Sequence, residues 1–300
     1  MIATHSVEIM SEVTPDQVLI VDRGREEARF ASDIPELQQF IRHVGGIHNL
    51  DLARILNNKR CLFIEGNEIG ILKHFQNTLF PSSPVPIDSV AKSSIGGWGG
   101  WQYVVGSSMW LEENTAGVSV YCALDSDYYT AEQKRARREE AAKKSIRLMV
   151  WTKKEIENYL LVPAAIQRLI SSRAKSAGPS LDDVEKALDR FAEELKESVE
   201  FSICEQILVN KKAQGPWKRE FLEELEAAKK FVQENWETLD ARLSIVSGKA
   251  VLSKLSKWAQ DEFNVNINAS SLAVALRPAE LPRDVRAFLY AFENNEPIPE

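Results

Sequence analysis

Short continuous runs of apolar residues alternate with amphipathic stretches in the first half of the chain. The runs typical of strands are VLIVD (18–22), CLFIE (61–65), VSVYCALDSD (118–127) and RLMVWT (147–152). Helical periodicity lies between them, with two short helices expected at 34–57 and longer ones at 68–80 and 101–113. A break at PSSPVP (81–86) is followed by an ambiguous segment, 87–94. This alternation predicts an α/β fold, with a mostly parallel sheet and helices on both faces.

From residue 163 onward the pattern changes to helices alone. Charged residues alternate with apolar ones at a period near 3.6, which is typical of amphipathic helices that pack on each other or on a sheet. The ranges expected to be helical are 163–174, 180–213, 217–243, 249–262 and 282–294. The sequence therefore predicts a helical extension behind the sheet.

The composition is that of an ordinary globular protein, with 44% hydrophobic and 27% charged residues among 300. No run approaches the roughly 18 apolar residues of a membrane helix, and no signal peptide is recognisable, so we expect a cytoplasmic protein without a membrane partner. The cysteines Cys61, Cys122 and Cys204 are widely spaced. They are expected to be buried thiols, not a disulfide framework or a zinc site.

A local basic block stands out in a chain whose net charge is −7. It comprises Lys134, Arg135, Arg137, Arg138, Lys143, Lys144, Arg147, Lys153 and Lys154, against Glu139 and Glu140 alone. A solvated helix face is the ordinary interpretation of such a run. If its neighbours bind metal and phosphate, the residues from Lys134 to Lys144 are candidates for binding a nucleic-acid backbone.

Carboxylates follow two of the apolar strands at the point where each strand ends. Glu65 follows the run at 61–64, and Asp125 and Asp127 end the run at 118–127. In an extended segment Asp125 and Asp127 would point the same way, and such repulsive pairs are usually sustained by a divalent cation. Oxygen ligands suit Mg²⁺ or Mn²⁺, and the carboxyl ends of parallel strands are where sites gather. The alternative for Glu65 is a cap on the following helix.

Three of these segments resemble a known family. FIEG followed by ALDSD is similar to the two acidic motifs of the TOPRIM domain, and WTKKEIENYLL (151–161) resembles the TOPRIM nucleases of the overcoming-lysogenization-defect (OLD) family. On a helix, Glu155 and Glu157 would be about 200° apart, so both cannot face one site. Glu157 is expected to face the site and Glu155 to be exposed.

The resemblance extends to both ends of the chain. SGKAVLSKL (247–255) resembles the segment that carries an active-site lysine, here Lys249, although an ordinary lysine at a helix start is the alternative. Residues 2–23 resemble the end of an ABC-type ATPase head, which would make His5 its switch histidine. The chain has no GxxxxGK[ST] loop, so ATP would enter only through a missing or separate ATPase part. The implied domains are an ATPase remnant (1–24), a helical linker (25–57), a TOPRIM core (58–165) and a helical extension (166–300).

The resemblance implies a metal-dependent endonuclease that cleaves DNA in anti-phage defence, partnered with an ABC-type ATPase and able to form a homodimer. Two Mg²⁺ or Mn²⁺ ions would be held by Glu65, Glu68, Asp125, Asp127 and Glu157, with Glu65, Asp125, Asp127 and Lys249 as the catalytic residues. The alternatives are a ribonuclease, a catalytically inactive partner module and an inactive regulatory fragment of an ATPase. Trp98 and Trp101 could stack on a base, although core packing is the ordinary role for both.

One position departs from the family pattern. The TOPRIM motif often reads EGxxD, and Ile69 stands here where that acid is expected. Glu68 is one step earlier, about 100° away around a helix. Either Glu68 substitutes for the missing acid, or the second metal ion is held weakly.

Overall fold

The computed structural model describes residues 2, 9, 13–22, 27–31, 50–66, 68–115, 117–175, 177–214 and 221–299. The chain divides into two compact units. The sheet unit comprises Met1–Ala123, Glu140–Met149 and Phe288–Glu300, and the helical unit comprises Leu124–Glu139 and Val150–Ala287. Each unit is thus assembled from segments that are distant in the sequence.

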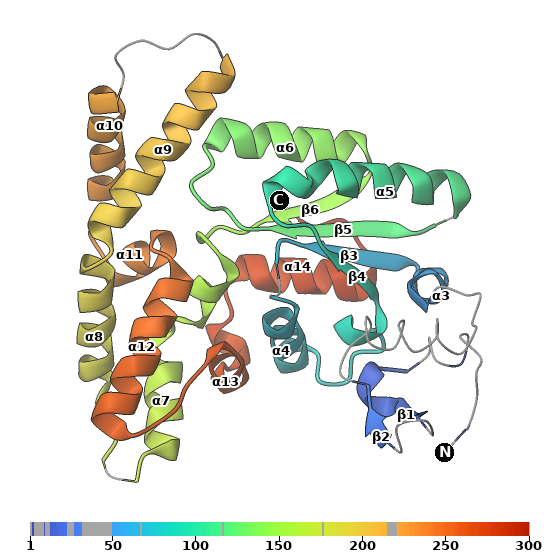
Figure 1. The fold of residues 1–300 in the computed structure, drawn as a ribbon, viewed down its shortest axis with the longest axis horizontal. Coiled ribbons are helices and arrows are strands. Elements are labelled where there is room, and N and C mark those ends of the chain that lie inside the picture. Colours follow the sequence, from blue (N-terminus) through green and yellow to red (C-terminus); the bar gives the residue numbers. More distant parts are fainter. Residues whose placement is uncertain are drawn as a thin grey trace. The chain divides into compact units, whose positions relative to one another are not determined.

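The sheet unit contains the four-stranded sheet, in the order β4-β3-β5-β6, and Figure 1 shows its strands. Strand β3 pairs in parallel with both β4 and β5. The bounds are Arg60–Ile64 for β3, Ala91–Ser94 for β4, Ser119–Leu124 for β5 and Ile146–Val150 for β6. This arrangement confirms the expected α/β fold with a mostly parallel sheet. Strand β4 lies in the segment that the sequence left ambiguous.

One face of the sheet is covered by the end of helix α14 (Arg283–Asn294). The Tyr121 ring on β5 meets the rings of Phe288 and Phe292 edge-on, at centroid distances of 6.4 and 5.1 Å. Arg60 also donates to the carbonyl of Phe292. Aromatic and polar contacts together therefore fix the C-terminal helix to β3 and β5.

The opposite face is covered by helix α5 (Trp101–Asn114). Leu62 is the register partner of Tyr121 and shares its face of the sheet. Phe63, the next residue of β3, points to the opposite face. Phe63 meets Tyr103 of α5 edge-on at 5.8 Å. Strand β3 is buried throughout and β5 in all but its first residue, as the continuous apolar runs predict, whereas Ser94 in β4 is exposed.

All three cysteines are buried and none is in a disulfide, which confirms the expectation from their spacing. Burial raises the pKa of the Cys61 thiol to about 12, so hardly any reactive thiolate forms near pH 8. We expect negligible labelling by iodoacetamide in the native protein and labelling of all three thiols in urea, measured by intact mass. Fast labelling of a native thiol would contradict the burial.

The remaining elements of the chain surround this sheet or form the helical unit. A small antiparallel hairpin pairs β1 with β2. The bounds are Leu19–Asp22 (β1), Glu27–Phe30 (β2), Leu50–Asn58 (α3), Ile69–Leu79 (α4), Ala131–Lys143 (α6), Pro163–Arg173 (α7), Leu181–Glu193 (α8), Lys196–Gln214 (α9), Phe221–Glu234 (α10), Leu239–Ile245 (α11), Gly248–Phe263 (α12) and Ala269–Ala275 (α13), with short 3₁₀ turns η1 at Pro15–Gln17, η2 at Ile87–Ser89, η3 at Trp98–Gly100, η4 at Ile156–Leu160 and η5 at Pro278–Glu280.

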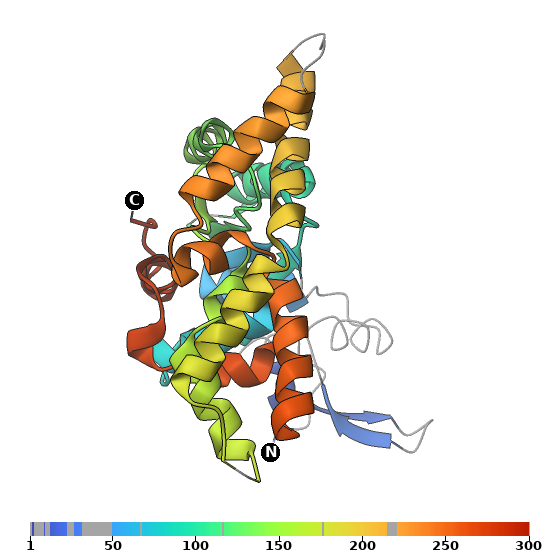
Figure 2. The same cartoon turned by 90° about the vertical axis from the view of Figure 1, so that its left-hand side faces the viewer.

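Two helices expected to be continuous are each divided in the structure. The range 180–213 forms α8 and α9, and the range 217–243 contains α10 and α11. Helix α11 begins after Thr238, whose hydroxyl accepts the Ala241 N–H. Figure 2 shows α9 (gold) and α10 (orange) side by side, and the separate helix α11 packs against α8.

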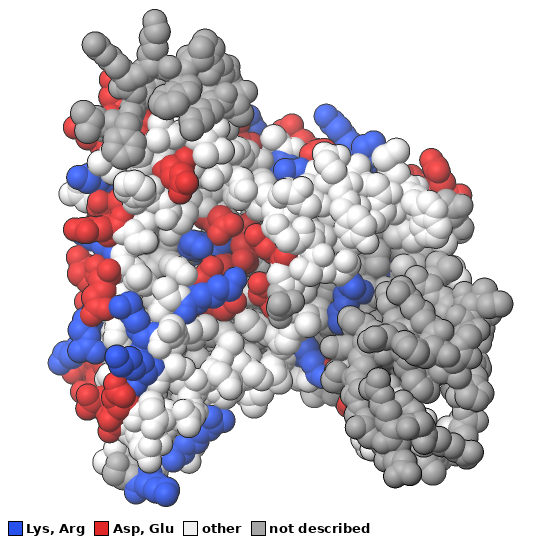
Figure 3. All heavy atoms as spheres, in the orientation of Figure 1, with Lys and Arg blue, Asp and Glu red and all other residues white. Residues whose placement is uncertain are grey.

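Charged side chains of both signs cover the surface of the helical unit. On the face drawn in Figure 3, acidic and basic residues are interspersed over α8. Among them Lys186 pairs with Asp182 one helical turn away. Within the described part of the chain, no helix has both the length and the apolar character needed to cross a membrane.

Candidate functional site

The two aspartates after β5 lie in a turn, not in an extended segment. The strand ends at Leu124, and Asp127 has φ of 39°, a left-handed conformation that Asp adopts more readily than most residues. The segment is not extended at Asp127, so strand alternation does not set the directions of the two side chains. The expectation that Asp125 and Asp127 point the same way for that reason is therefore wrong. Asp125 is buried, and its Oδ1 accepts the backbone N–H of Ile156 at 3.1 Å.

Lys154 places a positive charge between two of the carboxylates. Its Nζ lies 3.2 Å from Asp127 Oδ1 and 3.1 Å from Glu155 Oε2, with 13% of the side chain exposed. Its carbonyl accepts the N–H of Asp127 at 2.8 Å, which joins the two segments through the backbone as well. Burial alone would lower the pKa of Lys154, but Glu155 and Asp127 raise it above the ordinary value. The ammonium is therefore charged at neutral pH.

Glu155 is buried, so the expectation that it would be exposed is wrong. Only 4% of the residue is accessible. The reason is local structure: Glu155 has extended backbone angles and is the N-cap of the 3₁₀ turn η4, so the 200° offset of a continuous α-helix does not apply. Glu157 lies inside the turn and is also buried.

The carboxylate of Glu155 holds the start of α12. Its Oε1 accepts the Ser247 hydroxyl at 3.0 Å and the Lys249 backbone N–H at 2.7 Å. Burial would raise the pKa of this carboxyl, but Lys154 and the Lys249 amide outweigh burial and lower it. The charged form is thus stabilised where the helix N-terminus also favours an anion.

This contact brings Lys249 next to Glu157. The Lys249 Nζ lies 3.6 Å from Glu157 Oε1, and 55% of the lysine side chain is exposed. The two residues that the OLD-family resemblance assigns to one site, from segments far apart in the sequence, are therefore neighbours in the helical unit. Their catalytic roles stay a prediction.

Asn158 and Gly248 fix the distance between η4 and α12. Asn158 is fully buried, and its amide donates to the carbonyls of Leu243 and Val246 at 2.7 and 2.9 Å. A Cβ added to Gly248 would lie 2.7 Å from the Asn158 backbone nitrogen, which is closer than real Cβ contacts. Only glycine permits this approach.

We expect Gly248→Ala to lower the free energy of unfolding by about 1–3 kcal/mol, because the added carbon meets backbone that cannot easily move. Gly106→Ala is the matched control, since Gly106 is exposed in α5 with nothing near its Cβ position. It should be neutral or slightly stabilising. Equal urea unfolding curves for Gly248→Ala and the wild type would contradict the close approach.

In the sheet unit, Glu65 and Glu68 lie at the turn between β3 and α4. The N-cap of α4 is Glu68, so the alternative in which Glu65 caps this helix is wrong. A Cβ on Gly97 would lie 2.8 Å from Glu65 Oε1, so the Glu65 carboxylate rests against Gly97.

Glu68 precedes helix α4, so the 100° offset expected between positions 68 and 69 of a helix does not apply. Its Oε2 accepts the Gly66 N–H at 2.7 Å.

The basic block divides into surface and internal residues. Arg135, Arg138 and Lys143 are exposed on α6, and Arg135 pairs with Glu139 at 3.8 Å. Arg137 is half-buried, and Lys144 contacts the sulfur of Met109 at 3.8 Å.

Other lysines and arginines of the block contact residues of the fold. Lys134 donates to the Ser126 hydroxyl, and burial lowers the pKa of Lys134. Arg147 contacts Tyr121 and Lys154 pairs with the site carboxylates, both largely inside the protein, whereas Lys153 pairs with the exposed Asp240.

The structure decides the role expected of two tryptophans but does not describe the histidine near the start of the chain. Trp98 and Trp101 are 7% and 1% exposed, so they pack in the core and do not present a stacking surface. His5 lies outside the described residues.

The donor chemistry of the helical-unit site suits a hard divalent cation. Asp125, Asp127, Glu155 and Glu157 offer oxygen atoms only, the ligands that Mg²⁺ and Mn²⁺ prefer. In the part of the chain that the structure describes, no group of three or more His, Cys, Asp or Glu is arranged to hold a metal ion. Lys154 and Lys249 balance the negative charge of these carboxylates. The oxygen donors are thus of the type that binds Mg²⁺, but lysine ammonium groups already lie next to them.

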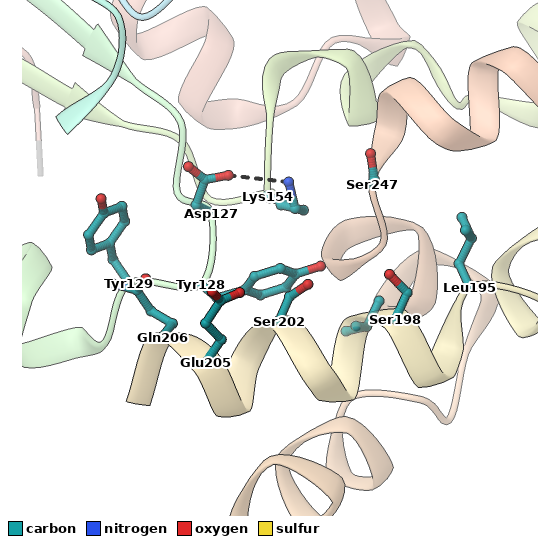
Figure 4. Close-up of a pocket in the computed structure, with 11 residues that line it drawn as sticks. Asp127, Tyr128, Tyr129, Lys154, Leu195, Ser198, Ser202, Glu205, Gln206 and Ser247 are labelled. Atoms are coloured by element: carbon teal, nitrogen blue, oxygen red, sulfur yellow. Dashed lines mark hydrogen bonds and ion pairs between the residues drawn. The ribbon is translucent and has the colours of Figure 1, made fainter. Parts of the chain in front are cut away.

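A pocket of about 320 Å³ opens beside Asp127 and Lys154, as Figure 4 shows. This pocket was not predicted from the sequence, because its other wall is one face of α9, whose first lining residue, Ser198, comes 71 residues after Asp127 and 44 after Lys154. Its lining residues are Asp127, Tyr128, Tyr129, Lys154, Leu195, Ser198, Val199, Ser202, Glu205, Gln206 and Ser247. Polar spacing along α9 was the one signal in the sequence, and it also fits a solvated face.

No protein-family model matches the chain, and no curated protein or solved structure shows significant similarity to it.

Proposed function

We propose that the chain is a metal-dependent phosphodiesterase that cleaves DNA. The observation that carries this proposal is the convergence of Lys249 on Glu157, beside the turn that carries Asp125 and Asp127. An ammonium next to several carboxylates is a suitable arrangement for phosphoryl chemistry, since the carboxylates attract a cation and the lysine favours negative charge on the substrate.

The roles follow from the positions of the side chains. Asp125, Asp127 and Glu157 are the proposed oxygen donors for Mg²⁺ or Mn²⁺, and because they are not arranged as a metal site in the described structure, binding would require their carboxylates to move closer together. The bound ion would supply an activated water for attack on a phosphodiester. Lys249, half exposed, would stabilise the charge that grows on the scissile phosphate. Glu155 positions Lys249 by holding the first turn of α12. Glu65 and Glu68 belong to the sheet unit and remain candidate ligands from the sequence alone.

The exposed part of the basic block would bind the phosphate backbone, with affinity that falls as salt increases. The roles in anti-phage defence, the ABC-type ATPase partner and the homodimer rest on the resemblance of the sequence segments alone.

A non-catalytic partner module is the second candidate. It is favoured by the ion pairs of Lys154, which already neutralise Asp127 and Glu155 without a metal ion. In such a module the acidic cluster would only join η4 to α12. The two candidates differ in whether purified protein cuts nucleic acid.

Lys249→Met should reduce Mg²⁺- or Mn²⁺-dependent cleavage of plasmid DNA by about 10²-fold or more, because the charge on the phosphate loses its ammonium. Lys254→Met on the same helix is the matched control; it loses an ion pair with Glu194 but lies outside the site. An RNA substrate in parallel reports the alternative substrate class.

The wild-type protein must cut with metal and stop cutting in EDTA for the proposal to stand. Absence of cleavage of both substrates, or equal rates for Lys249→Met and Lys254→Met, would favour the non-catalytic module.

A further inference from the structure

Helix α9 turns a polar face toward the pocket beside Asp127. Ser198, Ser202, Glu205 and Gln206 recur at intervals of three or four residues, which places them on one side of the helix. Figure 4 shows these side chains directed toward the turn that carries Asp127. Ile203 and Cys204 of the same helix are buried in the unit. Val199 of α9 also lines the pocket but is buried, so the accessible α9 side chains of the pocket are the polar ones, which can hydrogen-bond to a ligand or to water.

The charges of the pocket disfavour an anion. Asp127 and Lys154 form an ion pair at 3.2 Å, and Glu205 adds a second carboxylate. The lining therefore carries more negative than positive charge, and a phosphate group placed inside would be repelled. The hydroxyls of Ser198 and Ser202 and the amide of Gln206 instead offer donors and acceptors to a neutral group.

Tyr128 gives the pocket a fixed aromatic wall. Its hydroxyl donates to the Ile245 carbonyl at 2.9 Å, and the Lys154 ammonium lies 5.3 Å from the ring centroid. These two contacts hold the ring in one orientation beside Ser202, as Figure 4 shows. A planar ligand can therefore contact the ring without first having to order it.

We propose that this pocket binds one nucleoside, the base with its sugar, of a single-stranded DNA segment next to the cleaved bond. This inference rests on the proposed nuclease function. A volume of about 320 Å³ is at the lower end of ligand pockets, which span ~300–1,000 Å³. Aromatic contact with Tyr128 and hydrogen bonds from the α9 face suit a neutral base and sugar, while the adjoining phosphates would stay outside, toward Lys249.

The test is the binding of short single-stranded DNA that carries 2-aminopurine at successive positions, measured by fluorescence in EDTA so that nothing is cut. We expect quenching at one position, and loss of affinity when that position is made abasic. Ser202→Trp fills the pocket and should weaken DNA binding about tenfold, which is the affinity that one base stacked on an aromatic ring contributes. Glu197→Trp is the control, since Glu197 is exposed on α9 and does not line the pocket.

Ser202→Ala combined with Gln206→Ala removes the hydrogen-bonding groups without adding bulk, and circular dichroism checks the fold of each variant. The inference is overturned if DNA does not bind, if an abasic site binds equally well, or if Ser202→Trp and Glu197→Trp bind alike. The nuclease proposal has its own readout, because the same proteins are assayed for cleavage with Mn²⁺. Binding at the pocket without any cleavage would contradict the nuclease and leave the nucleoside site standing.

Discussion

Asp125→Asn should reduce metal-dependent DNA cleavage by about 10²–10³-fold or more, because the site loses a buried negative charge that would hold the cation. The substitution preserves the shape of the side chain and an oxygen that can accept the Ile156 N–H. The turn after β5 should therefore keep its structure while its charge changes. Plasmid cleavage at several Mn²⁺ concentrations measures the effect, and weaker metal binding should also shift the metal dependence to higher concentrations.

Asp182→Asn is the control for this substitution, since Asp182 is an exposed carboxylate of α8 that pairs with Lys186. Its cleavage rate and metal dependence should equal those of the wild type. If Asp125→Asn cuts at the wild-type rate, Asp125 does not hold the metal. If it loses activity together with its native circular dichroism spectrum, the loss reports unfolding and Asp125→Glu, which keeps the charge, decides between the two roles.

The sheet was predictable because burial on both faces leaves a direct signal in the sequence. The strands β3, β5 and β6 are runs of apolar residues, and each was expected within a few residues of its bounds. Strand β4 was not recognised, since AKSS has little apolar character and its pairing with β3 depends on tertiary structure. The break between α8 and α9 has no Gly or Pro to mark it, whereas Thr238 was a recognisable cap signal for α11.

The candidate site was only partly predictable. Acidic residues at strand ends and the late lysine could be identified from local motifs. The burial of Glu155 could not, because it depends on a 3₁₀ turn and on α12, which supplies Ser247 and the Lys249 amide. Lys154 appeared in the sequence as one member of a basic run, and its contacts with Asp127 and Glu155 exist only in the folded chain. Pairings of this kind depend on long-range packing, which no local pattern encodes.

Lys154→Met should lower the free energy of unfolding by about 3 kcal/mol, since it removes one partner of a buried ion pair. Glu155 keeps its two contacts with α12 but loses the ammonium, and its side chain is only 6% exposed. The Asp127 carboxylate, which is 37% exposed, would be compensated in part by water. Urea unfolding followed by tryptophan fluorescence measures the change. Lys186→Met is the control, because its ion pair with Asp182 is exposed to solvent and should contribute little to stability.

The same variant separates the two candidate functions when unfolding is repeated with Mn²⁺. If the carboxylates bind a divalent ion, the ion should replace the missing ammonium and restore stability, by about 2.7 kcal/mol at a concentration 100 times its dissociation constant. Lys154→Met should then gain more from Mn²⁺ than the wild type does, since the wild-type site already contains a cation. If Lys154→Met is less stable than the wild type and Mn²⁺ does not restore its stability, the carboxylates form ion pairs with lysines but do not bind a divalent ion. That is the behaviour expected of a non-catalytic module. Unchanged stability without metal would show that the Lys154 pairs contribute little to folding, and the positive charge beside Asp127 would then have to be explained by substrate binding alone.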